Sequence, residues 1–93
     1  MPSLTQNEKE MLIHALPSGQ ICLMRAGQVG DFVQSGSFDY LDDHDPSLQA
    51  RGIDTLDSLQ AHGLVRFQAG QLYKLTGSGF DQARQLEQQQ KQP

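Results

Sequence analysis

Apolar side chains near the N-terminus recur at helical spacing, which predicts a helix from about Gln6 to Leu16 that buries one face. The positions of this face are Met11, Leu12, Ala15 and Leu16. Thr5 and Glu8 match a capping box, in which each side chain accepts a hydrogen bond from the other residue's backbone N–H. The run Pro17-Ser18-Gly19 is expected to end the helix.

The spacing changes to two between Gln20 and Leu41. Apolar and polar positions alternate from Ile21 to Leu23, a second extended run covers Val29 to Gln34, and Phe38 and Tyr40 share one face of a third. Ala26-Gly27 offers a turn, and Gly30 and Gly36 punctuate the segment as turns or bulges do. This segment predicts a β-hairpin or small meander.

A second amphipathic helix is predicted from Ser47 to His62, with Asp45 as its cap and Pro46 at its first position. Its apolar face consists of Leu48, Gly52, Ile53, Leu56 and Leu59. The opposite stripe consists of Ser47, Arg51, Asp54 and Ser58. Gly63 is a natural C-terminal stop.

Two short β-prone runs, residues 64–67 and 72–75, flank the turn Gln68-Ala69-Gly70-Gln71 and predict a second hairpin. Thr76 then caps a last helix whose buried face carries Phe80, Ala83 and Leu86, while Gly77 and Gly79 weaken its first turn. Residues 1–87 are expected to form a single α+β domain. Residues 88–93 are expected to be a disordered polar tail.

The 93 residues allow one domain with a modest core and disfavour a large internal cavity. The single cysteine, Cys22, excludes an internal disulfide and fits a reducing compartment. No apolar run approaches the roughly 20 residues that span a bilayer. The first residues lack the pattern of a secretory signal. We therefore expect a cytoplasmic protein without a membrane segment.

The net charge of −4 is unevenly distributed. Residues 31–57 hold seven aspartates and one cation, Arg51, whereas the remaining segments carry six cations and four acids. Nucleic-acid binders usually show a basic stripe, because neutralised phosphates supply much of their affinity. The acidic middle of the chain disfavours uniform affinity for nucleic acid.

The pattern L-x-x-L-x-x-x-G-L-V from Leu56 to Val65, followed by the residues 72–76 and Gly79, resembles the second half of a bacterial winged helix-turn-helix. Repressors of the multiple-antibiotic-resistance and arsenic-resistance families carry similar sequences. The resemblance covers about a third of the chain. It implies a three-helix core with a β-hairpin wing and, in DNA-binding members, a recognition helix in the major groove.

The first half departs from that pattern, because strands between Gln20 and Leu41 occupy the place of the short helix before the recognition helix. The whole chain is more similar to an uncharacterised winged-helix-like module of prokaryotic proteins. The matching residues are Leu4, Thr5, Gly19, Ile21, Arg25, Gly27, Gly36, Asp45, Pro46, Ala50, Arg51, Gly63, Leu64 and Val65. This resemblance implies a winged-helix-like fold but no particular activity.

If the second helix reads nucleic acid, its contacts come from that helix and from the wing. The candidates are Arg51, Thr55, Ser58, Arg66, Gln71 and Lys74. Arginine can bond guanine bidentately, and cations on the wing can hold phosphates. The alternative is a solvated helix face beside an ordinary hairpin, and Asp54 and Asp57 would repel phosphate there.

Other candidate chemistry has simpler explanations. The residues 42–45 offer carboxylate and imidazole groups, but their spacing matches no calcium or zinc motif, and turn formation and capping account for them. Cys22 is expected to be a structural thiol, His14 and His62 suit the ends of helices, and Phe38 is expected in the core, with Phe32 either in the core or exposed.

We therefore expect neither catalytic residues nor a metal, cofactor or small-molecule substrate. The favoured function is a non-enzymatic interaction or regulatory module that binds a protein partner or itself. The alternative is a DNA-binding transcriptional regulator acting as a dimer.

Overall fold

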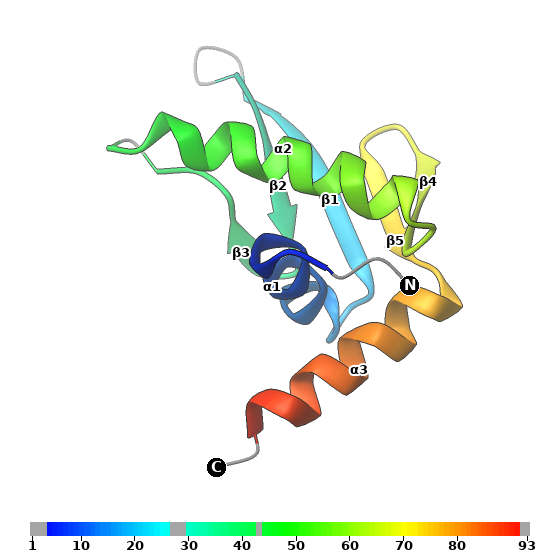
Figure 1. Cartoon of the computed structure of the whole chain (residues 1–93). Coiled ribbons are helices and arrows are strands. Elements are labelled where there is room, and N and C mark those ends of the chain that lie inside the picture. Colours follow the sequence, from blue (N-terminus) through cyan, green and yellow to red (C-terminus); the bar gives the residue numbers. More distant parts are fainter. Residues whose placement is uncertain (1–3, 27–29, 43, 92–93) are drawn as a thin grey trace.

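The computed structural model describes residues 4–26, 30–42 and 44–91. Within these residues the chain forms three helices and five strands, which confirms the predicted mixed α+β class (Figure 1). In chain order they are α1 Gln6–Ala15, β1 Gln20–Ala26, β2 Gly30–Ser35, β3 Phe38–Asp39, α2 Pro46–Ala61, β4 Val65–Ala69, β5 Leu72–Leu75 and α3 Gly77–Lys91. This is the order of elements that the sequence predicts.

The helix ends lie where the local sequence places them. Thr5 accepts a hydrogen bond from the Glu8 N–H at 3.2 Å, and Glu8 accepts one from the Thr5 N–H at 2.8 Å, so the predicted capping box is present. Asp45 caps α2 by accepting from the Ser47 N–H. Gly63, with φ of 76°, ends α2 in the left-handed region that glycine tolerates.

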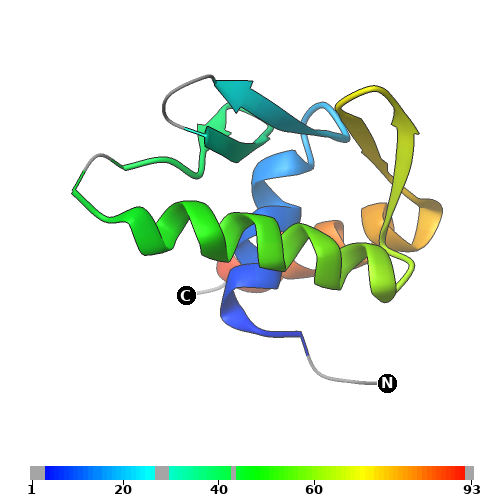
Figure 2. The same ribbon diagram turned by 90° about the horizontal axis from the view of Figure 1, so that it is seen from above.

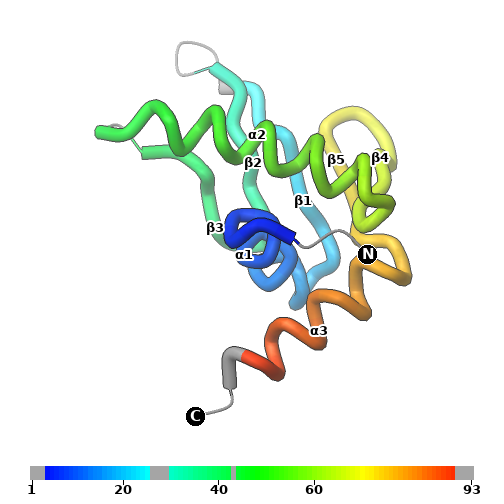
Figure 3. Tube along the Cα trace, in the orientation of Figure 1, coloured from blue at the N-terminus to red at the C-terminus, as the bar shows by residue number. Residues whose placement is uncertain are grey.

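The five strands form one antiparallel sheet in the order β3-β2-β1-β5-β4. β1 lies in the centre, between β2 and β5, as the backbone trace in Figure 3 shows. The predicted meander and the predicted second hairpin are therefore not separate. They are joined because Gln20, Ile21 and Cys22 pair with Lys74, Tyr73 and Leu72. The predicted turn at Ala26-Gly27 and the start of the second run at Val29 involve residues outside the described ones.

The molecule has two layers. Figures 1 and 2 show the helices on one side of the sheet, with α2 crossing over β1 and β2 and α1 lying below it. In the described part of the chain, no helix lies on the other side of the sheet. One face of the sheet is therefore covered and the other is not.

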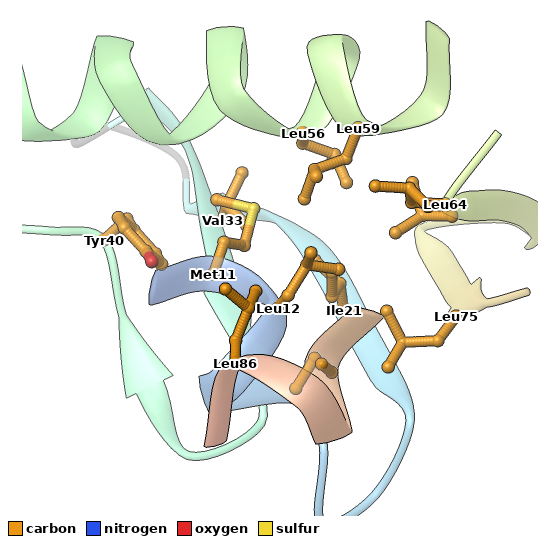
Figure 4. Packing of buried hydrophobic residues seen from close by; sticks show 13 residues of the cluster. Met11, Leu12, Ile21, Val33, Tyr40, Leu56, Leu59, Leu64, Leu75 and Leu86 are labelled. Carbon is orange, nitrogen blue, oxygen red and sulfur yellow. The ribbon is translucent and has the colours of Figure 1, made fainter. Parts of the chain in front are cut away.

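The core fills the space between the helices and the covered face (Figure 4). Leu12, Ile21 and Leu59 have no exposed surface and come from α1, β1 and α2. The buried apolar residues are Met11, Leu12, Ala15, Ile21, Val33, Tyr40, Leu56, Leu59, Leu64, Val65, Leu75, Ala83 and Leu86. Ser35 is a buried polar residue beside this core, and its hydroxyl donates a hydrogen bond to the Met11 carbonyl at 2.7 Å. The predicted apolar faces of all three helices contribute to this core.

Three details correct the sequence-based expectations. Phe38 is 39% exposed and is not a core residue, because β3 is a two-residue edge strand whose outer side meets solvent. Tyr40 lies beyond the end of β3 and is buried beneath α2. Helix α3 extends through Lys91, so the predicted tail is helical over residues 88–91, in keeping with the good helix propensity of Gln and Lys.

Candidate functional site on the uncovered sheet face

The uncovered side of the sheet carries side chains that alternate with core residues along each strand. Successive strand residues point to opposite faces, and Ile21, Val33 and Leu75 point into the core. Their neighbours therefore point away from the helices. We call this surface the open face; its residues are Gln20, Cys22 and Met24 of β1, Phe32 and Gln34 of β2, Asp39 of β3, Arg66 of β4, and Leu72 and Lys74 of β5.

The centre of the open face is apolar. Met24 pairs with Phe32 across β1 and β2, and Cys22 pairs with Leu72 across β1 and β5. All four side chains are half-buried, although no second layer lies above them within the described residues. These four adjacent apolar side chains on the central strands form a small patch whose exposure to water is unfavourable.

Charged groups occupy the two ends of the open face. Arg66 and Lys74 are direct cross-strand partners at the end formed by β4 and β5, and both are exposed. Asp39 lies at the opposite end, on β3, where it pairs with Gln34. Among the described residues, Asp39 is the one acid on this face. The open face is therefore locally positive at one end and negative at the other, although the whole chain has a charge of −4.

The six residues predicted to contact nucleic acid do not share one surface. Arg66 and Lys74 are brought together on the open face, and Gln71 is exposed in the turn beside them. Arg51 is exposed on α2, in the helical layer on the other side of the sheet. The structure therefore divides the predicted contacts between two sides of the molecule.

Two of the predicted contacts face inward rather than toward solvent. Thr55 is 7% exposed, and its hydroxyl donates to the Arg51 carbonyl at 2.6 Å, as a threonine inside a helix often does. Ser58 is half-buried, and its hydroxyl donates to Glu8 at 2.8 Å. The expectation that these residues form an outer reading surface is corrected, because the inward face of α2 is wider than its apolar spacing indicates.

A buried carboxylate links the first and second helices. Glu8 is 3% exposed, and its Oε2 accepts from the Ser58 hydroxyl and lies 3.2 Å from His62 Nε2. Burial raises the pKa of Glu8, but the hydrogen bonds from Thr5 and Ser58 and the proximity of His62 outweigh it, so its pKa lies below the usual value. Ser58 and His62 both contact Oε2 of Glu8. The Ser58 hydroxyl therefore donates its proton to Glu8 and not to the imidazole. This arrangement ties α1 to the end of α2.

An aromatic cluster lies at the β3 edge. His14 stacks on Phe38 with 4.4 Å between ring centroids, and Phe38 meets Tyr40 edge to face at 4.8 Å. Burial, followed by the nearby carboxylate of Glu10, raises the pKa of Tyr40 to about 12. The Tyr40 hydroxyl is buried and makes no hydrogen bond within the described residues. His14, in the last turn of α1, thus packs with Phe38 at this edge of the core.

An open groove of about 750 Å³ lies on the surface beside α3. Leu4, Leu64 and Leu86 line its apolar part, and polar side chains of α3 together with Lys9 and His62 line the rest. His62 forms part of its wall, but Glu8, which holds His62, is not among its lining residues. The groove therefore presents a mixed surface without a convergent set of chemical groups.

Within the described residues, no three His, Cys, Asp or Glu side chains come together as metal ligands would. Asp42 accepts from the His44 N–H at 2.8 Å and Asp45 caps α2, which are the turn and capping roles that the sequence predicts. Asp43 lies outside the described residues. Across the described residues, the helices lack the combination of length and apolar character that crossing a membrane requires.

Comparison of the chain with protein families, with curated proteins and with solved structures finds no match. The sequence alone did not identify the open face. The alternation in residues 20–24 and 32–34 was the available signal, but it does not say which side of a strand a helix will cover.

Proposed function

We propose that this chain is a non-enzymatic interaction module and that its open face binds protein. The observation that carries the proposal is the patch of Cys22, Met24, Phe32 and Leu72 on a sheet with helices on the other side only. Full burial of a Met, Leu or Phe side chain stabilises by about 1.5–3 kcal/mol relative to full exposure. Completing the burial of a half-buried side chain would therefore add about 1 kcal/mol. A protein laid over the open face recovers that free energy.

A winged-helix-like relationship belongs to this proposal. It is supported by the order of elements and by the β4–β5 hairpin, which directly follows α2 as a wing follows a recognition helix. In this interpretation the module uses the sheet beside the wing, and not the α2 surface, as its contact area. The buried Thr55 and the half-buried Ser58 favour that choice, since two of the three predicted contacts on α2 face inward.

The reactivity of Cys22 tests the proposal, because Cys22 is the chain's single thiol and lies at the centre of the open face. We expect a maleimide to label Cys22 readily in dilute purified protein and at least several-fold more slowly when the partner is present. The partner can be supplied as a native lysate or as the chain itself at high concentration. Labelling is followed by mass spectrometry.

A matched control places the thiol on the other side of the molecule. In Cys22→Ser/Asp57→Cys the new thiol replaces an exposed residue of α2, so its labelling rate should be the same in all three conditions. If Cys22 is labelled equally fast in dilute protein, concentrated protein and lysate, the open face is not a protein-binding surface.

A second candidate function is DNA binding as a dimer, and the adjacency of Arg66 and Lys74 favours it. Two neighbouring cations can hold a phosphate backbone, but Asp54 and Asp57 are exposed on α2 and oppose the approach of DNA to that side. Gel shifts with genomic DNA at low salt test this candidate. A shift that Arg66→Ala/Lys74→Ala abolishes would support it, and the absence of any shift at low salt would remove it.

A further inference from the structure

We infer that the open face is covered by a second copy of this chain, in a two-fold dimer whose axis runs along β1. This inference rests on the proposed function and names its partner. It follows from the distribution of charge on the open face and from the central position of β1 in the sheet.

When the strands of the two copies are aligned, two symmetric arrangements can bring two open faces together, and the charges distinguish them. A two-fold axis perpendicular to the strands places β4 and β5 over their own copies, so that Arg66 and Lys74 oppose the same cations. An axis parallel to β1 reverses the strand order instead. It places the end with Arg66 and Lys74 over the end with Asp39. Opposite charges meet only in the second arrangement.

The same axis makes the apolar centre self-complementary. β1 of one copy crosses over β1 of the other, so Cys22 and Met24 lie near their own counterparts. β2 of each copy lies over β5 of the other, which brings Phe32 diagonally toward the second copy's Leu72. The two sheets then pack as in a β-sandwich, about 10 Å apart.

The dimensions of the sheet limit the area that this contact can bury. With strands about 4.8 Å apart and a rise of about 3.3 Å per residue, the residues of the five strands cover about 400 Å² of one face, because β3, β4 and β5 are short. Two such faces bury about 800 Å², which is below the roughly 1,000 Å² of a stable specific interface and typical of a weak, transient one. We therefore expect a weak dimer, in which the exposed ion pairs determine the orientation and the apolar centre supplies most of the affinity.

Sedimentation velocity over a range of protein concentration tests the dimer. The wild-type chain should pass from a 10.3 kDa monomer to a dimer and stop there. Phe32→Glu should raise the dissociation constant about tenfold or more, because it puts a carboxylate into the apolar centre. Phe67→Glu is the matched control: Phe67 is 48% exposed but lies on the covered side of the sheet, so this variant should dimerise like the wild type.

A charge exchange tests the orientation without disturbing the core. Arg66→Asp should weaken the dimer, because β4 of one copy lies over β3 of the other and the new carboxylate then faces the second copy's Asp39. Asp39→Lys should weaken it as well, and the double variant should restore most of the affinity. With the axis perpendicular to the strands, Asp39 and Arg66 do not meet, so an absence of rescue overturns the proposed axis. This test stands even if Phe32→Glu fails to fold, which circular dichroism would show.

Cross-linking gives an independent measure of the axis. A short bismaleimide should join the Cys22 thiols of two copies at concentrations where the dimer forms, since the two sheets lie about 10 Å apart. Cys22→Ser/Asp57→Cys should give no such product above the level of random collision.

Other outcomes overturn the inference in distinguishable ways. A chain that stays monomeric at high concentration while Cys22 is protected in a lysate would leave the proposed function intact and assign the open face to a different protein. Species that keep growing with concentration would indicate a head-to-tail contact between the open face and the acidic helical side. Protection of Cys22 by a single-stranded oligonucleotide at low salt would assign the open face to nucleic acid.

Discussion

The two faces of β1 differ in what covers them. On the helical side Ile21 has no exposed surface and Leu23 packs against the core, whereas on the open side Cys22 and Met24 alternate with them and remain half-buried. The same strand therefore carries apolar residues on both faces, a pattern typical of a strand with a layer on each side. The difference teaches that the centre of the open face, unlike its charged ends, resembles the covered face in its apolar composition.

The two sides also differ in charge. The helical side and the loop before α2 carry most of the chain's acids, including the exposed Asp54 and Asp57, and a buried carboxylate, Glu8, holds two of its helices together. The open face carries a pair of cations and one acid. On the helical side a buried charge contributes to the fold, whereas the charges of the open face are exposed to solvent.

The largest expected effect comes from comparing one core substitution with one on the open face. Leu59→Ala removes a side chain with no exposed surface and should lower the free energy of unfolding by about 3 kcal/mol. Met24→Ala should lower it by about 1 kcal/mol or less, because Met24 is half-buried without a layer above it. Urea denaturation of dilute protein measures both. Equal losses would show that the open face contributes to the monomer as much as the core does.

Two glycines in the first turn of α3 differ in how closely the rest of the helical side packs against them. A Cβ on Gly79 would lie 2.0 Å from the Leu64 carbonyl oxygen, whereas a Cβ on Gly77 would have open space around it. Gly79→Ala should therefore cost roughly 1–3 kcal/mol through overpacking. Gly77→Ala should be neutral or stabilise by about 0.5–1 kcal/mol, because alanine favours the helix. Thermal melts of the two variants would refute this close approach if they shifted in the same direction.

The sequence predicted the elements that depend on neighbouring residues. The Thr5–Glu8 capping box, the stop at Gly63 and the cap at Thr76 are all confirmed, because each depends on groups only a few positions apart. The order of helices and strands followed from the same local signals. Gly79, which local propensity marks as a weakness, turns out to be required by its contact with Leu64.

The features that the sequence missed depend on distant pairs. Glu8 accepts a hydrogen bond from Ser58, fifty positions away in the sequence, and no local pattern predicts that contact. The pairing of β1 with β5 joins two predicted hairpins and creates the open face. Phe38 and Tyr40 alternate as partners on one face would, but β3 ends at Asp39, and Tyr40 then packs against Gly52 of α2. Alternation predicts a strand, but it does not predict where the strand ends or which face is covered.

The buried carboxylate predicts a pH dependence that belongs to the helical side. Because the pKa of Glu8 is lower in the folded chain than its ordinary value of 4.5, its stabilising contribution is complete above that value and is lost as the pH falls through the folded pKa. Glu8→Gln should cost about 1–2 kcal/mol near neutral pH, since it weakens hydrogen bonds to a charged acceptor. It should also flatten the acid limb of the stability curve.

The control for this prediction is Glu10→Gln, which replaces an exposed carboxylate on the same helix. That variant should keep the acid limb of the wild type. Urea titrations at a series of pH values from neutral to about 3 compare the three proteins. An unchanged acid limb in Glu8→Gln would show that other carboxylates govern the acid sensitivity.

The smallest expected effect concerns Tyr40, at the rim of the covered side. Its hydroxyl is buried and makes no hydrogen bond within the described residues, so Tyr40→Phe removes an unsatisfied group and should be neutral or raise the free energy of unfolding by up to about 1 kcal/mol. The pKa of Tyr40 is raised to about 12 from 10.0, so the wild-type chain should lose stability as the pH rises through this range. Tyr40→Phe should lose less, and Tyr73→Phe, at a half-buried position, serves as the control. Denaturation at pH 8 and above pH 10 measures both effects, and a destabilised Tyr40→Phe would reveal that the hydroxyl has a partner after all.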